Sequence, residues 1–327
     1  MFGALLACLA LTACAPDPGA ERQETLSVNF LDVEVTPAPN PLGLLDDPDP
    51  RLAANKRLVF DMWRSIVNAG HIELADEMLR EDYIQHSPVL PTGRAAFKQV
   101  FSVIPRRDIP ELVSPPLVAI LAEGDLVVMA LREELGGDGG EEPYTSTHFN
   151  LFRVEDGRLA EHWHSVTDAP GAEVLSPEKG GPQPVSGAIG AAQFALLEAD
   201  DPALAANKRL VFDALRDLYD GNQLNLADRY LADVFIEHDP NGFAGRERAP
   251  TMASDETSLA LPLVSMIAQG DLVVAVMARS HSHPVHEDQI YNTVRFEMFR
   301  IEDGRIAEHW NGATRGSPRL LREGDAA

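Results

Sequence analysis

The chain has 327 residues, 45% of them hydrophobic, which is enough for about two domains that each bury a core. Its 51 acidic and 27 basic residues give a formal charge of −24. Such a field repels phosphate backbones and anionic lipid surfaces, so neither nucleic acid nor a bare membrane surface is an expected partner.

The chain begins with an apolar run, Phe2 to Ala13, that is too short to span a bilayer but has the length of a signal-peptide core. It ends in Leu11-Thr12-Ala13-Cys14, which resembles a bacterial lipobox. The resemblance implies that residues 1–14 form a lipoprotein signal and that Cys14 is lipidated. It also implies an anchor on the periplasmic side of the outer membrane. No Lys or Arg precedes the run, and an apolar terminus of a cytoplasmic protein is the alternative.

Cysteine usage limits the possible chemistry. Cys8 and Cys14 are the only cysteines, and both belong to the expected signal region. The mature chain would then have no disulfide, no nucleophilic thiol and no cysteine-based zinc site.

The remainder divides into two linkers and two similar units. Residues 15–50 are rich in Pro, Asp and Ala and are expected to form a flexible tether, and residues 169–202 a second linker. Between and after them several segments recur in the same order. These are AANKRLVFD at 53–61 and 205–213, YIQHSP at 83–88 with FIEHDP at 235–240, GDLVV at 124–128 and 270–274, and EDGRLAEHWH at 155–164 with EDGRIAEHWN at 302–311. The sequence therefore predicts tandem domains of one fold, over 51–168 and 203–318, because the period far exceeds that of a solenoid.

Each unit is expected to begin with helices. In the first unit one apolar stripe recurs at spacings of three and four, preceded by Asp49-Pro50 as a start and followed by Gly70 as a stop. The stripe consists of Leu58, Val59, Met62, Trp63, Ile66 and Val67. A shorter helix with Leu74, Met78 and Leu79 on one side follows, and a third is expected from Arg94 to Val103.

Strands are expected in the second half of each unit. In the first unit, 117–121 and 126–131 predict one hairpin. A second hairpin is predicted by 149–154 and 159–166, because the Asp156-Gly157 turn joins two apolar runs. Helices followed by an antiparallel sheet indicate an α+β fold class.

Histidines are the main candidates for chemistry. His86 and His238 occupy equivalent places, as do His162 and His309 in the two EHW segments. Side chains alternate along a strand, so His162 should share a face with His164, and His309 with Asn311, while Trp163 and Trp310 point the other way. We take His86, His164, His162, His238, His309 and Asn311 as catalytic candidates, and Trp163, Trp310 and His148 as pocket-lining candidates.

Three interpretations of these residues stay open. They can be structural, hydrogen-bonded into a wall that both units share. They can act in acid–base chemistry, since imidazole exchanges protons near neutral pH without a metal. Metal binding is the third, suggested by His281 and His283 on one strand face with His286 and Glu287 nearby, although the first unit has no counterpart. No phosphate-binding, dinucleotide-binding or serine-hydrolase motif is present.

Taken together, the NKRLVFD helix, the YIQHSP segment, the GDLVV hairpin and the final FRVEDGRLAEHW strands resemble SnoaL-like proteins. These belong to the nuclear transport factor 2-like superfamily, which includes polyketide cyclases and ketosteroid isomerases. The resemblance implies two tandem cone-shaped α+β barrels, with N-terminal helices packed in a curved sheet around a pocket. It also implies proton abstraction next to a carbonyl, with no cofactor and no metal.

Many SnoaL-like sequences have Asp directly after EHW, where this chain has His164 and Asn311. His164 can act as a base and Asn311 cannot, so the first unit is the expected acid–base site and the second a degenerate copy. The expected function is a cofactor-free lyase or isomerase acting on a small carbonyl compound. The alternative is a non-catalytic module that binds a small-molecule ligand or a protein. The membrane would be contacted only through the lipid anchor, and the two units could pair within one chain or form a homo-oligomer.

Overall fold

The computed structural model describes residues 28–137, 142–166, 177–242, 257–283 and 290–315. The expected signal peptide, including Cys14, and the first part of the expected tether lie outside these residues. Within the described part of the chain, no helix is both long enough and apolar enough to cross a membrane.

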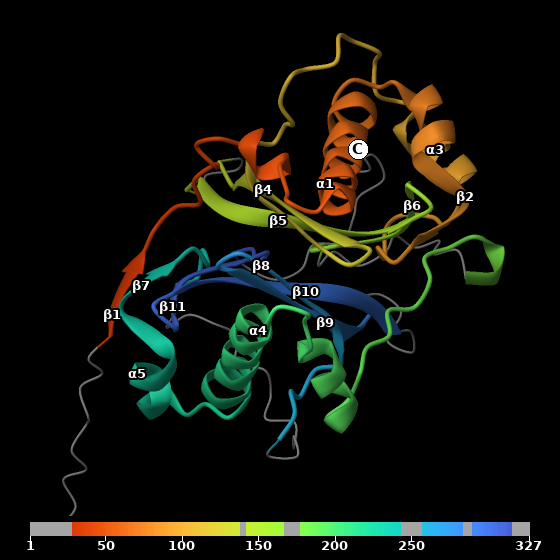
Figure 1. Cartoon of the computed structure of the whole chain (residues 1–327). Coiled ribbons are helices and arrows are strands. Elements are labelled where there is room, and N and C mark those ends of the chain that lie inside the picture. Colours follow the sequence, from red (N-terminus) through yellow and green to blue (C-terminus); the bar gives the residue numbers. More distant parts are fainter. Residues whose placement is uncertain (1–27, 138–141, 167–176, 243–256, 284–289, 316–327) are drawn as a thin grey trace, which may run out of the picture.

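Two units follow one another along the chain, each with helices first and strands after (Figure 1). The first contains α1 (Pro50–Met62), a π-helical turn (Trp63–Val67), α2 (Ala75–Met78), β2 (Leu79–Gln85), α3 (Arg94–Phe101), β3 (Leu117–Glu123), β4 (Leu126–Leu135), β5 (Tyr144–Glu155) and β6 (Arg158–His164). The second contains α4 (Pro202–Ala214), a π-helical turn (Leu215–Asp220), α5 (Ala227–Tyr230), β7 (Leu231–Glu237), β8 (Leu263–Gln269), β9 (Leu272–Ser282), β10 (Ile290–Glu302) and β11 (Arg305–Asn311). A short strand, β1 (Asn29–Asp32), precedes both.

The local signals in the sequence account for the ends of these elements. The carboxylate of Asp49 accepts a hydrogen bond from the backbone N–H of Arg51 at 2.8 Å and caps α1, and Asp201 caps α4 in the same way. Asp156 and Gly157 both have positive φ, 51° and 70°, which the tight turn between β5 and β6 requires. The expected helix starts and both expected hairpins are confirmed, whereas α3 ends at Phe101 rather than Val103.

The strand orders of the two sheets match. The first sheet has the order β2-β6-β5-β4-β3, and the second has β7-β11-β10-β9-β8 with β1 added beyond β7. Such a pair of sheets is consistent with two tandem α+β domains. The expected sheet was wholly antiparallel, but β2 runs parallel to β6, and β7 runs parallel to both β11 and β1. β2 and β7 therefore end at Gln85 and Glu237, and His86 and His238 follow directly after these strands.

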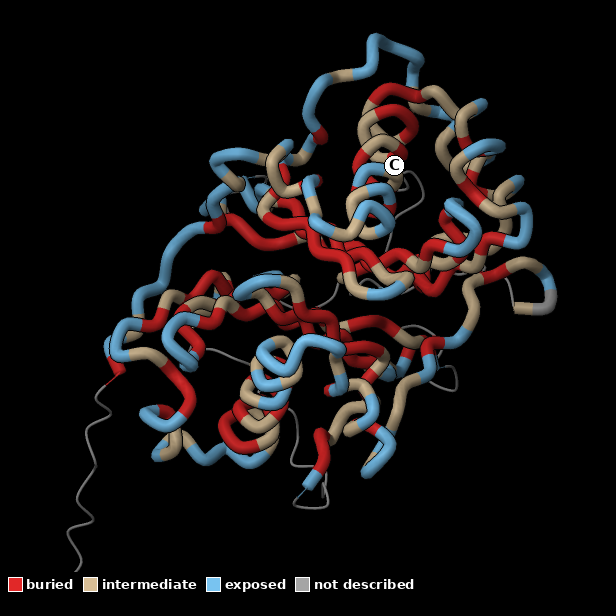
Figure 2. Tube along the Cα trace, viewed as in Figure 1, coloured by how far each residue is buried: buried red, intermediate tan, exposed pale blue. Residues whose placement is uncertain are grey.

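The helices cover the outer face of each sheet, and the inner faces of the two sheets pack on each other (Figure 1). Each unit has its own apolar core between helices and sheet. A third cluster joins both sheets and contains Phe149, Trp163, Phe296 and Trp310. Buried residues accordingly follow both sheets along their whole length (Figure 2).

The residues before each unit reach across to the sheet of the other unit. We call residues 29–35 the N-terminal arm and residues 183–188 the linker arm. In the N-terminal arm, β1 pairs with β7, and the N–H of Val33 donates to the carbonyl of Glu237 at 2.8 Å. In the linker arm, the N–H of Gln183 donates to the carbonyl of Gln85 at 2.7 Å. The expected flexible linkers 15–50 and 169–202 are thus structured in these parts, because their backbone groups extend the two sheets.

Both arms then return to their own unit. The N–H of Ala38 donates to the carbonyl of Leu117 in β3, and Ala188 pairs with Leu263 in β8. Val35 and Val185 are buried at equivalent places in the cluster between the sheets. The two units therefore exchange equivalent arms within one chain.

Candidate functional site

The alternation expected along the last strand of each unit is present. His162 stacks on Phe152 at 4.5 Å between ring centroids and faces the interior of the first unit, as does His164. Trp163 and Trp310 point the other way, into the cluster between the sheets. The two tryptophans therefore do not line the interior of either cone.

His86 and His238 lie on the face opposite His162 and His309. The His86 ring stacks on Trp163 at 4.6 Å and 4°, and the His238 ring stacks on Trp310 at 4.9 Å and 10°. The structure therefore does not bring His86 together with His162 and His164 in one pocket. The parallel register of β2 against β6 places Gln85, rather than His86, beside His162.

His86 and His238 belong to a network that both units share. Nε2 of His86 is 2.6 Å from a carboxylate oxygen of Glu161, and Nε2 of His238 is 2.8 Å from Glu308. The ring Nδ1 atoms face carbonyls of the arms, Gln183 at 3.1 Å and Val33 at 2.9 Å. The recurring His and Glu thus fasten the exchanged arms, which supports the structural interpretation for this part of the repeat.

The carboxylates of this network remain ionised over a wide pH range. Burial raises the pKa of Glu161, but hydrogen bonds from His86 and Arg153 outweigh this and hold it below its usual value. Glu308 behaves in the same way, with His238 and Arg300 as its partners. Paired charges of this kind at a half-buried edge stabilise the arrangement.

The interior of the first unit holds a neutral polar group. Nδ1 of His162 is 3.0 Å from Oε1 of Gln85, and its Nε2 is 3.0 Å from Oδ1 of Asn150. Burial, with smaller effects of His148 and His86, lowers the pKa of His162 to about 3. The ring is therefore neutral near pH 7 and has one N–H, which it donates to one of these two amide oxygens. Gln85 Oε1 also accepts hydrogen bonds from the backbone N–H groups of His86 and Ser87.

His164 and His148 adjoin this group. Nε2 of His164 is 2.5 Å from the hydroxyl of Ser87, and the His148 ring lies 5.6 Å from that of His164. Burial lowers the pKa of both, and for His164 the neighbouring His162 and His148 lower it further. The first unit thus gathers three neutral imidazoles.

The equivalent place in the second unit carries carboxylates. Nδ1 of His309 is 2.6 Å from Oε1 of Glu237, and its Nε2 is 2.5 Å from Oε2 of Glu297. The side chains of all three are completely buried. We call Glu237, His309 and Glu297 the acid trio. Arg295 pairs with the other oxygen of Glu297.

A further carboxylate, that of Asp239, lies beside the acid trio. Asp239 accepts a hydrogen bond from Nδ2 of Asn311 at 2.8 Å, and its backbone N–H donates to Glu237 at 3.0 Å. Asp239 is therefore the partner of Asn311, as Ser87 is the partner of His164 at the equivalent place in the first unit.

Sequence reasoning missed these acidic residues. The signal was present in the alignment of the repeats: Gln85, Ser87 and Asn150 of the first unit become Glu237, Asp239 and Glu297 in the second. Two of these neutral-to-acidic changes meet at His309, and the third lies beside Asn311.

The acid trio differs from the group around His162 in the charge of the acceptors. Both ring nitrogens of His309 face carboxylate oxygens, whereas those of His162 face amide oxygens. A neutral imidazole has one N–H and can donate to only one of two carboxylates, so an additional proton would be needed for the second contact.

The metal interpretation of His281, His283, His286 and Glu287 rests partly on residues that the structure does not describe. Nε2 of His281 is 2.7 Å from the hydroxyl of Thr293, and its ring stacks on Tyr291. His286 and Glu287 lie outside the part of the chain that the structure describes. Within that part, no group of three or more His, Cys, Asp or Glu side chains is placed to hold a metal ion.

A family model described as SnoaL-like polyketide cyclase matches residues 57–171. The first unit is therefore similar to SnoaL-like domains. Among solved structures, a protein of Jannaschia sp. CCS1 described as a SnoaL-like polyketide cyclase has 20% identity, covers 36% of this chain and 89% of its own, and has a TM-score of 0.28. An NTF2-like protein of Mesorhizobium loti has 20% identity, coverage of 36% and 94%, and a TM-score of 0.27.

A third solved structure, an LEH-like epoxide hydrolase of M. tuberculosis, has 15% identity, coverage of 34% and 80%, and a TM-score of 0.26. A comparison with curated proteins gave no match. The match to the family model ends at residue 171, so the site in the second unit has to be argued from its own residues.

Proposed function

We propose that the chain is a cofactor-free lyase or isomerase that uses acid–base chemistry on a small carbonyl compound, and that the second unit performs it. The similarity of the first unit to SnoaL-like domains and the equal strand order of the second support one family for both. The observation that carries the proposal is the acid trio, in which His309 lies between two buried carboxylates. This reverses the ranking expected from His164 and Asn311.

Burial of this many ionisable groups argues against a purely structural role. Moving a carboxylate out of water costs several kcal/mol unless its partners compensate, and neutral residues do the same structural work in the first unit. Gln85 and Asn150 hold His162 in the same geometry that Glu237 and Glu297 give His309. The charges therefore add a capacity to move protons that packing does not need.

The proposed reaction uses three groups of the second unit. Glu297 is completely buried, so the reaction needs an opening that admits the substrate. Glu297 then removes a proton from the carbon next to the substrate carbonyl, and the electron pair of that C–H bond moves into the enolate. Arg295, whose side chain is 25% exposed, stabilises the negative enolate oxygen. His309 then shares the proton between Glu297 and Glu237. Return of the proton to another carbon gives an isomer, and loss of a leaving group gives a lyase product.

The test measures deuterium exchange at the α-carbons of small ketones, β-keto esters and β-hydroxy ketones by proton NMR. The full chain should catalyse exchange for at least one compound. The double variant Glu237→Gln with Glu297→Asn should abolish it, because it recreates the neutral surroundings of His162. This variant is a matched one, since the same amides already surround a histidine in the first unit.

The control is His162→Gln in the first unit, which should leave exchange unchanged. Exchange that survives the double variant, or that is lost in the control instead, would overturn the assignment to the second unit. Absence of exchange for every compound would favour the non-catalytic alternative for both units.

We also propose that the chain is a lipoprotein of the cell envelope, anchored through Cys14. The lipobox-like segment supports this. Mass spectrometry of the expressed full chain and of Cys14→Ser would test it, with a diacylglycerol adduct expected only in the former.

A further inference from the structure

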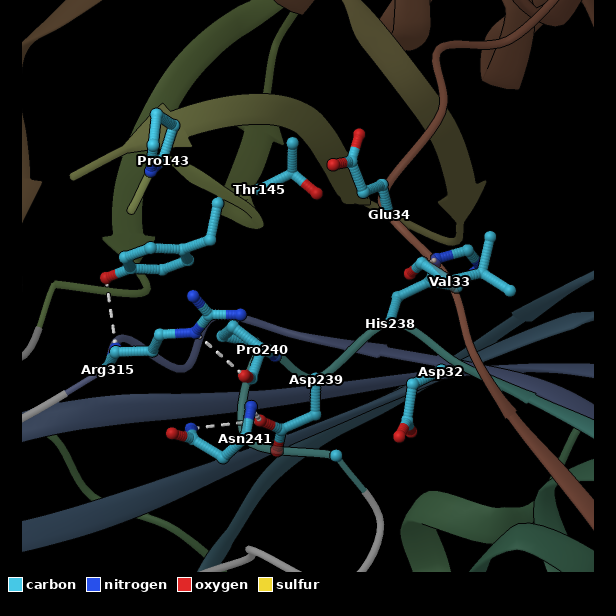
Figure 3. Close-up of a pocket in the computed structure, with 12 residues that line it drawn as sticks. Asp32, Val33, Glu34, Pro143, Thr145, His238, Asp239, Pro240, Asn241 and Arg315 are labelled. Carbon is cyan, nitrogen blue, oxygen red and sulfur yellow. Dashed lines mark hydrogen bonds between the residues drawn. The ribbon is translucent and has the colours of Figure 1, made fainter. Parts of the chain in front are cut away.

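A cleft opens where the two units, the N-terminal arm and the last described residues meet (Figure 3). Its volume is about 330 Å³, at the lower end of the range for sites that hold one small molecule. It lies outside the acid trio and on the other side of β7 from the helices of the second unit. We ask what its walls would bind.

The walls are held in place by hydrogen bonds between segments far apart in the sequence. The N–H of Val35 donates to the hydroxyl of Thr145 at 2.8 Å, which fixes the N-terminal arm on β5. The N–H of Arg315 donates to the hydroxyl of Tyr144 at 3.0 Å. The Nε of Arg315 donates to the carbonyl of Pro240 at 3.0 Å. A site built this way exists before a ligand arrives.

Arg315 presents a cation to the cleft. Its guanidinium lies 4.7 Å from the centroid of the Tyr144 ring and points into the open space (Figure 3). Among the residues that the structure describes, no carboxylate lies within ion-pair distance of it, and only its Nε has a hydrogen-bond acceptor. The two terminal nitrogens are the pair that binds a carboxylate in bidentate fashion.

The N-terminal arm presents anions to the same cleft. Asp32 and Glu34 both line it, and neither pairs with Arg315. The cleft therefore keeps opposite charges apart across an open space. A ligand that carries both a carboxylate and an ammonium group would neutralise them together.

The equivalent place in the first unit lacks these charges. The carbonyl of Val33 contacts His238 as the carbonyl of Gln183 contacts His86, which aligns the two arms. In this alignment Asp32 corresponds to Pro182, and Glu34 corresponds to Pro184. Packing of an arm thus requires neither carboxylate. Their presence on only one of two equivalent arms indicates a separate role.

We propose that this cleft binds a small zwitterion of the α-amino acid class, with Arg315 on its carboxylate and Glu34 on its ammonium group. The binding is independent of the acid–base reaction proposed for the second unit. It joins that unit structurally, because Asp239 lines the cleft and also contacts Asn311 and Glu237.

The test is calorimetric titration of the full chain with the common L-α-amino acids, with acetate and methylamine as single-charge probes. At least one amino acid should bind, and neither single-charge probe should bind as tightly. Arg315→Gln and Glu34→Gln should each weaken binding by roughly tenfold or more, because each removes a charge-assisted contact. Arg158→Gln, an exposed arginine of the β5–β6 turn, is the control and should leave binding unchanged.

Two outcomes would overturn the proposal. Acetate that binds as well as the amino acids, with Glu34→Gln unaffected, would make the cleft a simple anion site. No binding of any amino acid at millimolar concentration, with the variants as thermally stable as the parent, would mean that the charges do not form a site.

Discussion

The rings of Phe149 and Phe296 stack at the centre of the contact between the two sheets, 5.3 Å apart and only 4° from parallel. Phe149 comes from β5 and Phe296 from β10, which are equivalent strands of the two units. Both side chains are buried, and both belong to the cluster that joins the sheets. The two units therefore share an apolar core as well as exchanging arms.

Phe296→Ala should destabilise both units. Removal of a buried aromatic ring costs about 3–5 kcal/mol, and the cavity would open on both sheets at once. Urea unfolding followed by tryptophan fluorescence should show one transition at lower urea, since Trp63 reports on the first unit and Trp310 on the shared cluster. A first-unit transition that keeps its parent midpoint would contradict shared stability.

The sequence predicted the local structure of this contact but not its partners. The Asp156-Gly157 turn and the alternation of His162, Trp163 and His164 are properties of a few neighbouring residues, and they were read correctly. β2 pairs with β6 across more than 70 residues of sequence. Local patterns therefore do not say on which side of β6 it adds or in which direction it runs. The face on which His86 lies could therefore not be predicted from the sequence.

The arms were missed for a different reason. β1 has four residues and lies in a Pro- and Asp-rich segment, so neither its length nor its composition distinguishes it from a linker. Its backbone finds partners only because β7 leaves an edge open in the folded chain. The acid trio could have been found, because its acidic residues occupy repeat-equivalent positions that sequence comparison already aligns.

His238→Phe should loosen the N-terminal arm. The aromatic stack on Trp310 is kept, but the contacts with the Val33 carbonyl and with Glu308 are lost. We expect a loss of about 1–3 kcal/mol and faster amide hydrogen exchange in residues 29–35. The matched variant His86→Phe should act on residues 183–188 instead. If each variant loosened both arms equally, the arms would not be fastened separately.

The interior histidines of the first unit should make the chain acid-sensitive. The pKa of His162 is about 3 in the folded chain against a usual 6.5, and those of His148 and His164 are also lowered. The unfolded chain therefore binds more protons between these values. The stability that these groups contribute is present above pH 6.5 and is lost as the pH falls toward 3. Each histidine contributes a slope of about 1.4 kcal/mol per pH unit.

His164→Asn isolates this effect, because Asn311 occupies the equivalent place in the second unit. The variant should lower the slope of unfolding free energy against pH by up to about 1.4 kcal/mol per unit. Urea unfolding between about pH 5 and 6.5 measures this slope. Carboxylates such as Glu161, whose pKa is lowered, titrate below that range. An unchanged slope would show that His164 is not buried as a neutral group.

The acid trio should respond to substitution in a non-additive way. Glu297→Asn alone leaves Arg295 without the carboxylate that it pairs with and leaves His309 with only one acidic neighbour. We expect a loss of about 3–5 kcal/mol, the usual cost of breaking a buried charge pair. Adding Glu237→Gln restores a neutral set like that around His162, and Arg295 is partly exposed to water. The double variant should therefore be more stable than the single one and close to the parent.

Chemical denaturation of the parent, both single variants and the double variant forms a complete thermodynamic cycle. A double variant that loses the sum of both single effects would mean that the two carboxylates act independently. The proton shared through His309 would then have no energetic basis. Recovery in the double variant, with loss of α-carbon exchange, would separate the structural role of the residues around His309 from the chemistry of their charges.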